Sequence, residues 1–163
     1  MGRQGRFNTN RGISRSFGIA IALAAAVGLS AGLSGCSADA GPKVSATAGP
    51  TASATPEPGS ALGPAQFAAA LKLPDTTLID VRTPAEFAQG HLPGAINIDY
   101  ESPDFLDQVS ALHPDLNYAL YCHSGNRSGA ALGVMTGMGI TEVFHLDGGI
   151  SAWQEAGGEV VTD

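Results

Sequence analysis

Cysteine is scarce in this chain, whose 163 residues include only two, Cys36 and Cys122. An exported domain held together by disulfides normally carries an even set of cysteines at paired spacings. A bridge between these two is formally possible, but it would not amount to a disulfide framework. The sequence also lacks a His and Cys spacing typical of zinc and a glycine-rich loop of the nucleotide-binding kind. We therefore expect no metal and no cofactor.

Positive charge is scarce beyond the first 35 residues. Residues 1–35 contain four of the eight basic side chains and no acidic one. The rest of the chain has four basic residues against all 15 acidic ones, a net charge of −11. Nucleic acid calls for a basic surface, and an acidic surface is repelled by anionic lipid. The composition therefore argues against a nucleic-acid partner and leaves covalent or spanning attachment as the routes to a membrane.

A single long apolar run is present, over residues 17–33, and a basic segment precedes it. This layout is typical of an export signal. The run closes in Leu-Ser-Gly-Cys at residues 33–36, which resembles the lipobox of bacterial lipoproteins. The resemblance implies a signal peptide over residues 1–35, a lipid on Cys36 and anchoring to the outer face of the bacterial cell membrane. An uncleaved anchor or an ordinary signal with an incidental cysteine are the alternatives, although the run is short for a stable span.

Residues 36–62 consist mainly of Ala, Ser, Thr, Pro and Gly. Such a segment cannot bury enough apolar surface to offset its ordering entropy, so we expect a flexible tether. From residue 63 to residue 163 the pattern changes to alternating helices and strands, over a length usual for one small domain.

Within this domain, strand and helix patterns alternate along the chain. The expected helices span residues 64–72, 84–88, 102–109, 127–138 and 149–156, and the expected strands span residues 77–81, 95–98, 118–122 and 143–146. Ser102 is expected at an N-cap and Pro103 at the first helical position after it. Strands that alternate with helices indicate an α/β fold, with a parallel sheet and helices on both of its faces.

The stretch from Tyr118 to Ser128 carries the strongest chemical signal. Cys122 stands where a buried strand should end, and Arg127 and Ser128 stand where a helix should begin. Ligands bind beyond the carboxyl ends of strands in open parallel sheets, and a helix N-terminus offers free N–H groups to an anion. The same groups lower the pKa of a nearby thiol. The stretch therefore predicts a thiolate together with a small anion pocket.

Four local patterns follow one another in a specific order. They are residues 78–87 (LIDVRTPAEF), residues 90–97 (GHLPGAIN), residues 121–128 (YCHSGNRS) and residues 146–153 (LDGGISAW). In this order and spacing they closely resemble the rhodanese-like domain family of sulfurtransferases, over roughly residues 60–163. The resemblance implies a three-layer α/β/α fold with a parallel sheet of about five strands. It also implies that Cys122 is the catalytic nucleophile and carries a persulfide between two half-reactions.

The resemblance further implies that the loop after Cys122 binds the sulfur substrate through inward-pointing N–H groups. The implied substrate-binding residues are His123, Ser124, Gly125, Asn126, Arg127 and Ser128. Gly125 and Asn126 both tolerate left-handed backbone angles. The expected partners are a small sulfur-donor anion such as thiosulfate and a thiol or cyanide acceptor. A neutral His123 offers little fixed charge to a doubly charged donor, and a lipid on Cys36 would leave the acceptor to come from outside the chain.

Two other function classes remain as alternatives. Related cysteine phosphatases place five residues between Cys and Arg, whereas four separate Cys122 from Arg127 here. The shorter loop favours sulfur over a phosphate ester or arsenate. The domain could instead be a persulfide or thiol-sensing module, or a protein-binding module, with little turnover of its own; the sequence names no protein partner.

Several polar residues outside the loop are expected to have structural roles. Asp80, Arg82 and Glu86 resemble a site triad, but we assign them to structural support, with an ion pair between Arg82 and Glu86. His113 is expected on the surface and His145 within a strand.

Overall fold

The structure is a computed structural model that describes residues 43–162. The expected signal peptide, Cys36 and residues 37–42 of the expected tether lie outside the described residues. Between residues 43 and 162 no helix combines the length and the apolar character needed to cross a membrane.

The core of the domain is a five-stranded sheet in which every neighbouring pair of strands is parallel. Its strands are β1 (Ala61–Leu62), β2 (Thr76–Asp80), β3 (Ile96–Asn97), β4 (Asn117–Tyr121) and β5 (Val143–Leu146), and they lie in the order β1-β5-β4-β2-β3. The longest ladder joins β2 to β4, from Thr76 opposite Asn117 to Asp80 opposite Tyr121. The predicted parallel sheet of about five strands is confirmed.

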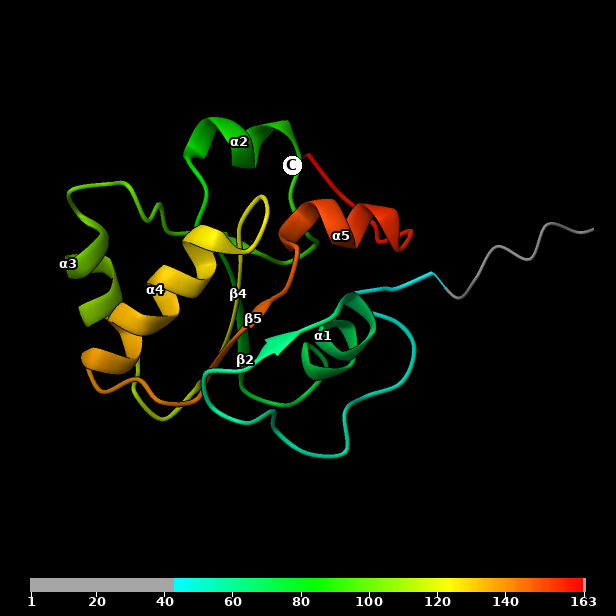
Figure 1. Ribbon diagram of the computed structural model, residues 1–163, viewed down its shortest axis with the longest axis horizontal. Helices are drawn as coiled ribbons and strands as arrows, with labels where there is room; N and C mark the ends of the chain where they lie inside the picture. Colours follow the sequence, from blue (N-terminus) through cyan, green and yellow to red (C-terminus); the bar gives the residue numbers. More distant parts are fainter. Residues whose placement is uncertain (1–42, 163) are drawn as a thin grey trace, which may run out of the picture. The chain divides into compact units, whose positions relative to one another are not determined.

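Helices cover both faces of this sheet. They are α1 (Pro64–Ala70), α2 (Pro84–Gln89), α3 (Phe105–Ser110), α4 (Asn126–Gly137) and α5 (Gly149–Glu155). In Figure 1, α3 and α4 lie on one side of the strands and α1 and α5 on the other, while α2 lies beyond one end of the sheet. The predicted α/β/α layering is therefore confirmed, and α2, which has no buried residue, stands at the edge where the strands end.

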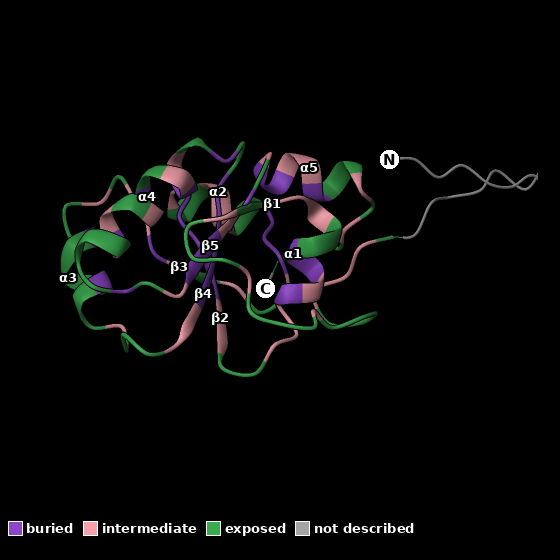
Figure 2. Cartoon of the chain, turned by 60° about the horizontal axis from the view of Figure 1, so that its bottom comes forward, coloured by how far each residue is buried: buried purple, intermediate pink, exposed green. Residues whose placement is uncertain are grey.

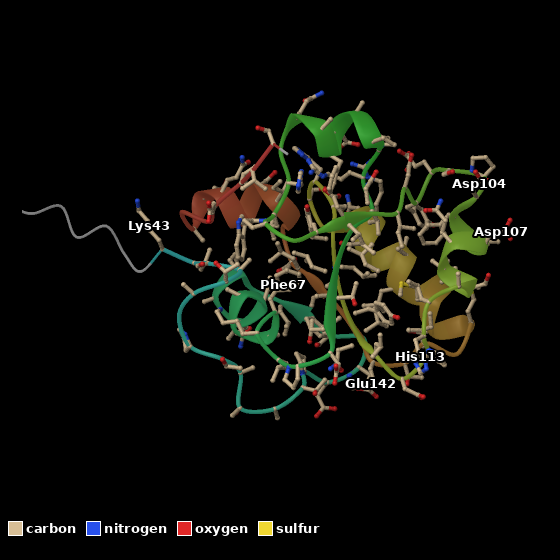
Figure 3. The ribbon with its side chains drawn as sticks, turned by 180° about the vertical axis from the view of Figure 1, so that it is seen from behind. Lys43, Phe67, Asp104, Asp107, His113 and Glu142 are labelled. Atoms are coloured by element: carbon tan, nitrogen blue, oxygen red, sulfur yellow. The ribbon has the colours of Figure 1, made fainter. Side chains whose placement is uncertain are left out.

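Two hydrophobic clusters fill the spaces between the layers, because successive strand side chains point to opposite faces. Leu120 packs with the α3 and α4 side, whereas Ala119 and Tyr121 pack with the α1 and α5 side. Figure 2 shows buried residues along the strands and on the inner sides of the helices. Phe67 of α1 belongs to the second cluster and is fully buried (Figure 3).

The start of α3 differs from the prediction. The helix begins at Phe105, and Ser102 is not its N-cap. The Ser102 hydroxyl accepts a hydrogen bond from the Asp104 N–H at 3.2 Å, and its carbonyl accepts one from the Phe105 N–H at 3.1 Å. These local bonds fold residues 102–105 into a turn, which competes with a helical start at Ser102.

The segment before α1 lies along the domain from Lys43 onward, although we expected a flexible tether over residues 36–62. The Val44 N–H donates to the Ala156 carbonyl at 3.3 Å, and the Ala52 N–H donates to the Ala69 carbonyl at 2.9 Å. Strand β1, which was not predicted, pairs with β5. Val44 and Ala46 also pack against the second hydrophobic cluster. They are isolated apolar residues in a segment of small and polar residues, so its composition gave no sign of these contacts.

Candidate active site

The loop that follows β4 brings Cys122 to the carboxyl edge of the sheet. Residues 122–125 make the loop, and α4 begins at Asn126. Gly125 adopts φ 95°, and a Cβ there would lie 3.3 Å from the Gly148 nitrogen. At Gly149, which has φ 59°, a Cβ would lie 2.4 Å from the Cys122 carbonyl oxygen. Only glycine permits both the left-handed backbone and this approach of the two loops.

Asn126 tolerates a left-handed backbone but does not adopt it here. It is instead the first residue of α4, and Gly125 alone makes the left-handed turn. His123 and Ser124 are exposed at the mouth of the loop, as is Asn126, whereas Gly125 and Ser128 are buried.

Protein donors surround the thiol of Cys122. Its Sγ accepts a hydrogen bond from the Gly125 N–H at 3.1 Å and lies 3.6 Å from the Ser128 hydroxyl. Burial alone would raise the pKa of this thiol, since only 1% of the residue is exposed. Hydrogen bonds from Ser128, Ser124 and Gly125 outweigh burial and lower the pKa below its ordinary value. The loop therefore favours the thiolate, which is the nucleophilic form of cysteine.

The first turn of α5 holds the outer side of the loop. The Ile150 N–H donates to the Cys122 carbonyl at 2.8 Å, and the Ser151 hydroxyl donates to the His123 carbonyl at 3.0 Å. These bonds join the two carbonyl groups to α5, while the Gly125 N–H of the same loop donates to Sγ.

Arg127 is paired with carboxylates at the rim of the loop. Its guanidinium binds both oxygens of Glu86, at 2.7 and 2.8 Å, and reaches Glu101 at 3.3 Å. The hydrogen bonds from Arg127 lower the pKa of Glu86 to about 2, against the opposing effect of burial. The expected ion pair between Arg82 and Glu86 is wrong, because the Glu86 carboxylate binds the Arg127 guanidinium instead. The substrate-binding role of Arg127 stays a prediction.

Thr83 and Glu86 also form a capping box at the start of α2. The Glu86 N–H donates to the Thr83 hydroxyl, and the Glu86 carboxylate accepts from the Thr83 N–H at 3.1 Å. We did not predict this cap, although Thr and Glu three residues apart are its usual signature.

Arg82 instead makes a buried ion pair with Asp80. The nearest guanidinium nitrogen lies 2.5 Å from the carboxylate, and the same nitrogen donates to the Gly90 carbonyl at 2.7 Å. The Asn97 amide donates to the backbone carbonyls of both residues. The guanidinium also lies over the Tyr121 ring, 5.7 Å from its centre. These contacts hold Asp80 and Arg82 together in the interior, although Arg82 also lines the cleft beside the loop, so their structural role stays a prediction.

Two residues that contact members of the site were not predicted. Glu101 follows β3 in a loop without a recognisable motif, and it approaches Arg127 only in the folded chain. His145 was expected only as a strand residue, but its Nδ1 lies 3.2 Å from the Ser128 hydroxyl. The alternating pattern of β5 could have indicated the face on which His145 lies. His113 is exposed at the end of the sheet opposite α2 (Figure 3).

A cleft of about 350 Å³ opens beside the loop. His123 lines it from the loop, Gln89 from α2 and Gln154 from α5. Figure 1 shows α2 and α5 on either side of the loop between β4 and α4. The charged side chains of Arg82 and Glu86 also line it, so a small ligand next to the loop meets both neutral and charged polar groups. Between residues 43 and 162 no cluster of His, Cys, Asp and Glu could hold a metal ion.

Comparisons with known proteins agree with this arrangement. A family described as the rhodanese-like domain matches residues 63–156. Thiosulfate sulfurtransferase 16 of Arabidopsis thaliana is 43% identical over 89 residues, which cover 48% of this chain and 74% of that protein. Thiosulfate sulfurtransferase GlpE of Stutzerimonas stutzeri is 33% identical over 92 residues, 56% of this chain and 82% of that protein. The crystal structure of a rhodanese-related protein from Thermoplasma volcanium superposes with a TM-score of 0.57 at 31% identity, covering 64% of this chain and 99% of the other.

Proposed function

Since the chain belongs to the rhodanese-like domain family, we propose that it is a sulfurtransferase that uses Cys122 as its nucleophile. The observation that carries this proposal is the set of donors around Cys122 Sγ. The Gly125 N–H lies 3.1 Å from the sulfur, and the loop's hydrogen bonds lower the pKa of the thiol. The proteins named thiosulfate sulfurtransferase among the relatives support the same reaction class.

The proposed reaction has two half-reactions. The Cys122 thiolate attacks the outer sulfur of a donor such as thiosulfate, the S–S bond breaks, and sulfite leaves with the electron pair. Cyanide or a thiolate then attacks the outer sulfur of the Cys122 persulfide. This step releases thiocyanate or a new persulfide and regenerates the Cys122 thiolate. The scheme predicts ping-pong kinetics, as is usual for a covalent intermediate on the enzyme.

The acceptor in this scheme comes from outside the described domain. Cys122 is the only cysteine between residues 43 and 162, so this part of the chain holds no second thiol to resolve the persulfide. The cleft beside His123 offers a place for the body of the acceptor next to the loop.

We also propose that the chain is exported and anchored through a lipid on Cys36, on the evidence of the motif at residues 33–36. Expression of the full chain followed by fractionation tests this point. The unchanged protein should accumulate with the membrane, and Cys36→Ala should not; an equal distribution of the two would contradict the proposal.

Thiocyanate formation from thiosulfate and cyanide tests the enzymatic proposal. Cys122→Ser should abolish it, and Cys36→Ser, the matched control, should leave it unchanged in the purified protein. Activity that survives Cys122→Ser would remove Cys122 from the mechanism.

A sensor or carrier module is the second candidate, and the pairing of Arg127 favours it. Because Glu86 and Glu101 already neutralise this guanidinium, the rim presents little free positive charge to a dianion. A chain that gains sulfur on Cys122 without forming thiocyanate would support this candidate. A chain that shows neither adduct nor product would support a binding module.

A further inference from the structure

The Ser128 hydroxyl, in the first turn of α4, lies within hydrogen-bonding distance of three groups. Its oxygen is 3.6 Å from Cys122 Sγ, 3.1 Å from the Gly125 carbonyl oxygen and 3.2 Å from His145 Nδ1. Ser128 is fully buried, so its hydroxyl bonds with these groups and not with bulk water. A hydroxyl has a single proton, and it can donate to only one of the three at a time.

The state of His145 Nδ1 decides which acceptors compete. If Nδ1 carries a hydrogen, it donates to the Ser128 oxygen, and the hydroxyl proton is left to Sγ or to the Gly125 carbonyl. If Nδ1 carries none, it competes with the thiol for that proton. Between the two remaining acceptors a thiolate is favoured, since a hydrogen bond to a charged acceptor is roughly twice as strong as a neutral one.

We propose that His145 is a positioning residue that donates from Nδ1 to the Ser128 oxygen and thereby keeps the hydrogen bond of the Ser128 hydroxyl directed at Cys122 Sγ. His145 acts only through Ser128 and has no contact with the substrate in this scheme. The proposal deepens the proposed function, because it concerns the same thiolate, but the state of the thiol can be measured without any sulfur transfer.

The surroundings of His145 are consistent with a neutral ring that donates. On the neighbouring strands it pairs with Ala61 of β1 and Leu120 of β4, and a Cβ at Gly129 of α4 would lie 3.5 Å from its Cε1. None of these residues titrates.

Two titratable groups of the described domain do act on this ring: Asp147, two residues along the chain, and Cys122, through Ser128. Burial lowers the pKa of His145 more than the charge of Asp147 raises it. The ring is therefore neutral at neutral pH. In the neutral ring, Nδ1 donates only in the tautomer that carries its hydrogen on Nδ1. At acid pH the imidazolium also carries a hydrogen on Nδ1, so the donation persists there.

The rate of alkylation of Cys122 by iodoacetamide across pH tests the proposal. The full chain is used, and mass spectrometry of peptides reads Cys122 separately from Cys36. In His145→Phe the ring cannot donate, and the pH at half-maximal rate should rise by about half a unit to one unit. Ser128→Ala, which removes the donor itself, should raise it by at least as much.

A double substitution separates this relay from a general packing effect. If His145 acts through Ser128, adding His145→Phe to Ser128→Ala should cause no further rise. His145→Asn keeps an N–H donor and should restore most of the original midpoint. His113→Phe, at an exposed histidine far from the loop, should leave the midpoint unchanged.

Two results would overturn the proposal: an unchanged midpoint in His145→Phe, or shifts that simply add in the double variant. A His145→Asn midpoint equal to that of His145→Phe would also count against donation. His145→Leu replaces His145→Phe if the larger ring prevents folding, as judged by circular dichroism. Loss of sulfur transfer with the expected midpoints intact would refute the proposed function and leave the relay standing.

Discussion

Two arginines at the carboxyl edge of the sheet each bind carboxylates, but they differ in burial. Arg82 and Asp80 are buried together, with 6% and 0% of their side chains exposed. Arg127 lies at the rim, with 23% of its side chain exposed, and its partners Glu86 and Glu101 are 31% and 60% exposed. Water can replace a lost partner at the rim, whereas a lost partner in the interior leaves an uncompensated charge. The buried pair therefore stabilises the fold, and the rim pairs shape the surroundings of the thiol.

The same contrast bears on the positive charge that is left for the sulfur donor of the proposed reaction. Residues 43–162 contain four basic residues, and the two arginines among them are already paired. Of the lysines, Lys43 begins the described chain, and Lys72 donates to the backbone carbonyls of Ser45 and Ala68. In the proposed reaction, the N–H groups of the loop are therefore the main donors to an anionic substrate.

Breaking the buried pair should have the largest effect. Arg82→Met leaves Asp80 buried and unpaired, and we expect a loss of about 3–5 kcal/mol in the free energy of unfolding. Arg127→Met is the matched control at the rim, where we expect the free energy of unfolding to fall by about 1 kcal/mol. Urea unfolding followed by circular dichroism measures both. Equal losses would show that burial does not distinguish the two arginines.

The ion pair between Arg127 and Glu86 should make the free energy of unfolding depend on pH. The pKa of Glu86 is lowered in the folded protein to about 2, from an ordinary value of 4.5. A lowered folded-state pKa contributes stability that is fully present above pH 4.5 and is lost as the pH falls toward 2. Glu86→Gln should flatten the decline of unfolding free energy over this range, as measured by urea titrations at several pH values. Glu155→Gln, at an exposed position of α5, is the control and should leave the decline unchanged. A decline in Glu86→Gln as steep as that of the unchanged protein would contradict the pairing of Glu86 with Arg127.

The smallest effect is expected from the outer partner of Arg127. Glu101→Gln removes one of its two carboxylates and makes the rim more positive. We expect kcat/KM for thiosulfate, a dianion, to rise roughly twofold at low salt, and the gain to shrink at high salt. The monoanion methanethiosulfonate should gain less. An equal rise in kcat/KM for both donors, or a rise that is the same at low and high salt, would show that charge at the rim does not govern the choice of donor.

The order of helices and strands from α1 to α5 was predictable, because apolar periodicity and Pro or Gly boundaries mark each element locally. The position of Cys122 between a strand end and a helix start was predictable for the same reason. Strand β1 was not, because two residues on an edge carry no pattern. The start of α3 was misplaced because Ser102 makes a turn whose side-chain bond imitates a cap.

The partners of the site residues could not be predicted in the same way. Arg127 and Glu86 are 41 positions apart, and Ser128 and His145 are 17 apart, so only the folded sheet brings them together. The error on Arg82 and Glu86 had a different source. Their spacing of four suits an ion pair, but Asp80 provides Arg82 with a buried partner two residues away, and the capping box and Arg127 engage Glu86.

The mass of the Cys122 peptide after incubation with thiosulfate, in the absence of an acceptor, tests the central claim most directly. We expect a gain of one sulfur atom on this peptide, no gain in Cys122→Ser, and return to the original mass when cyanide is added. An unchanged Cys122 peptide in a protein that still forms thiocyanate would contradict it.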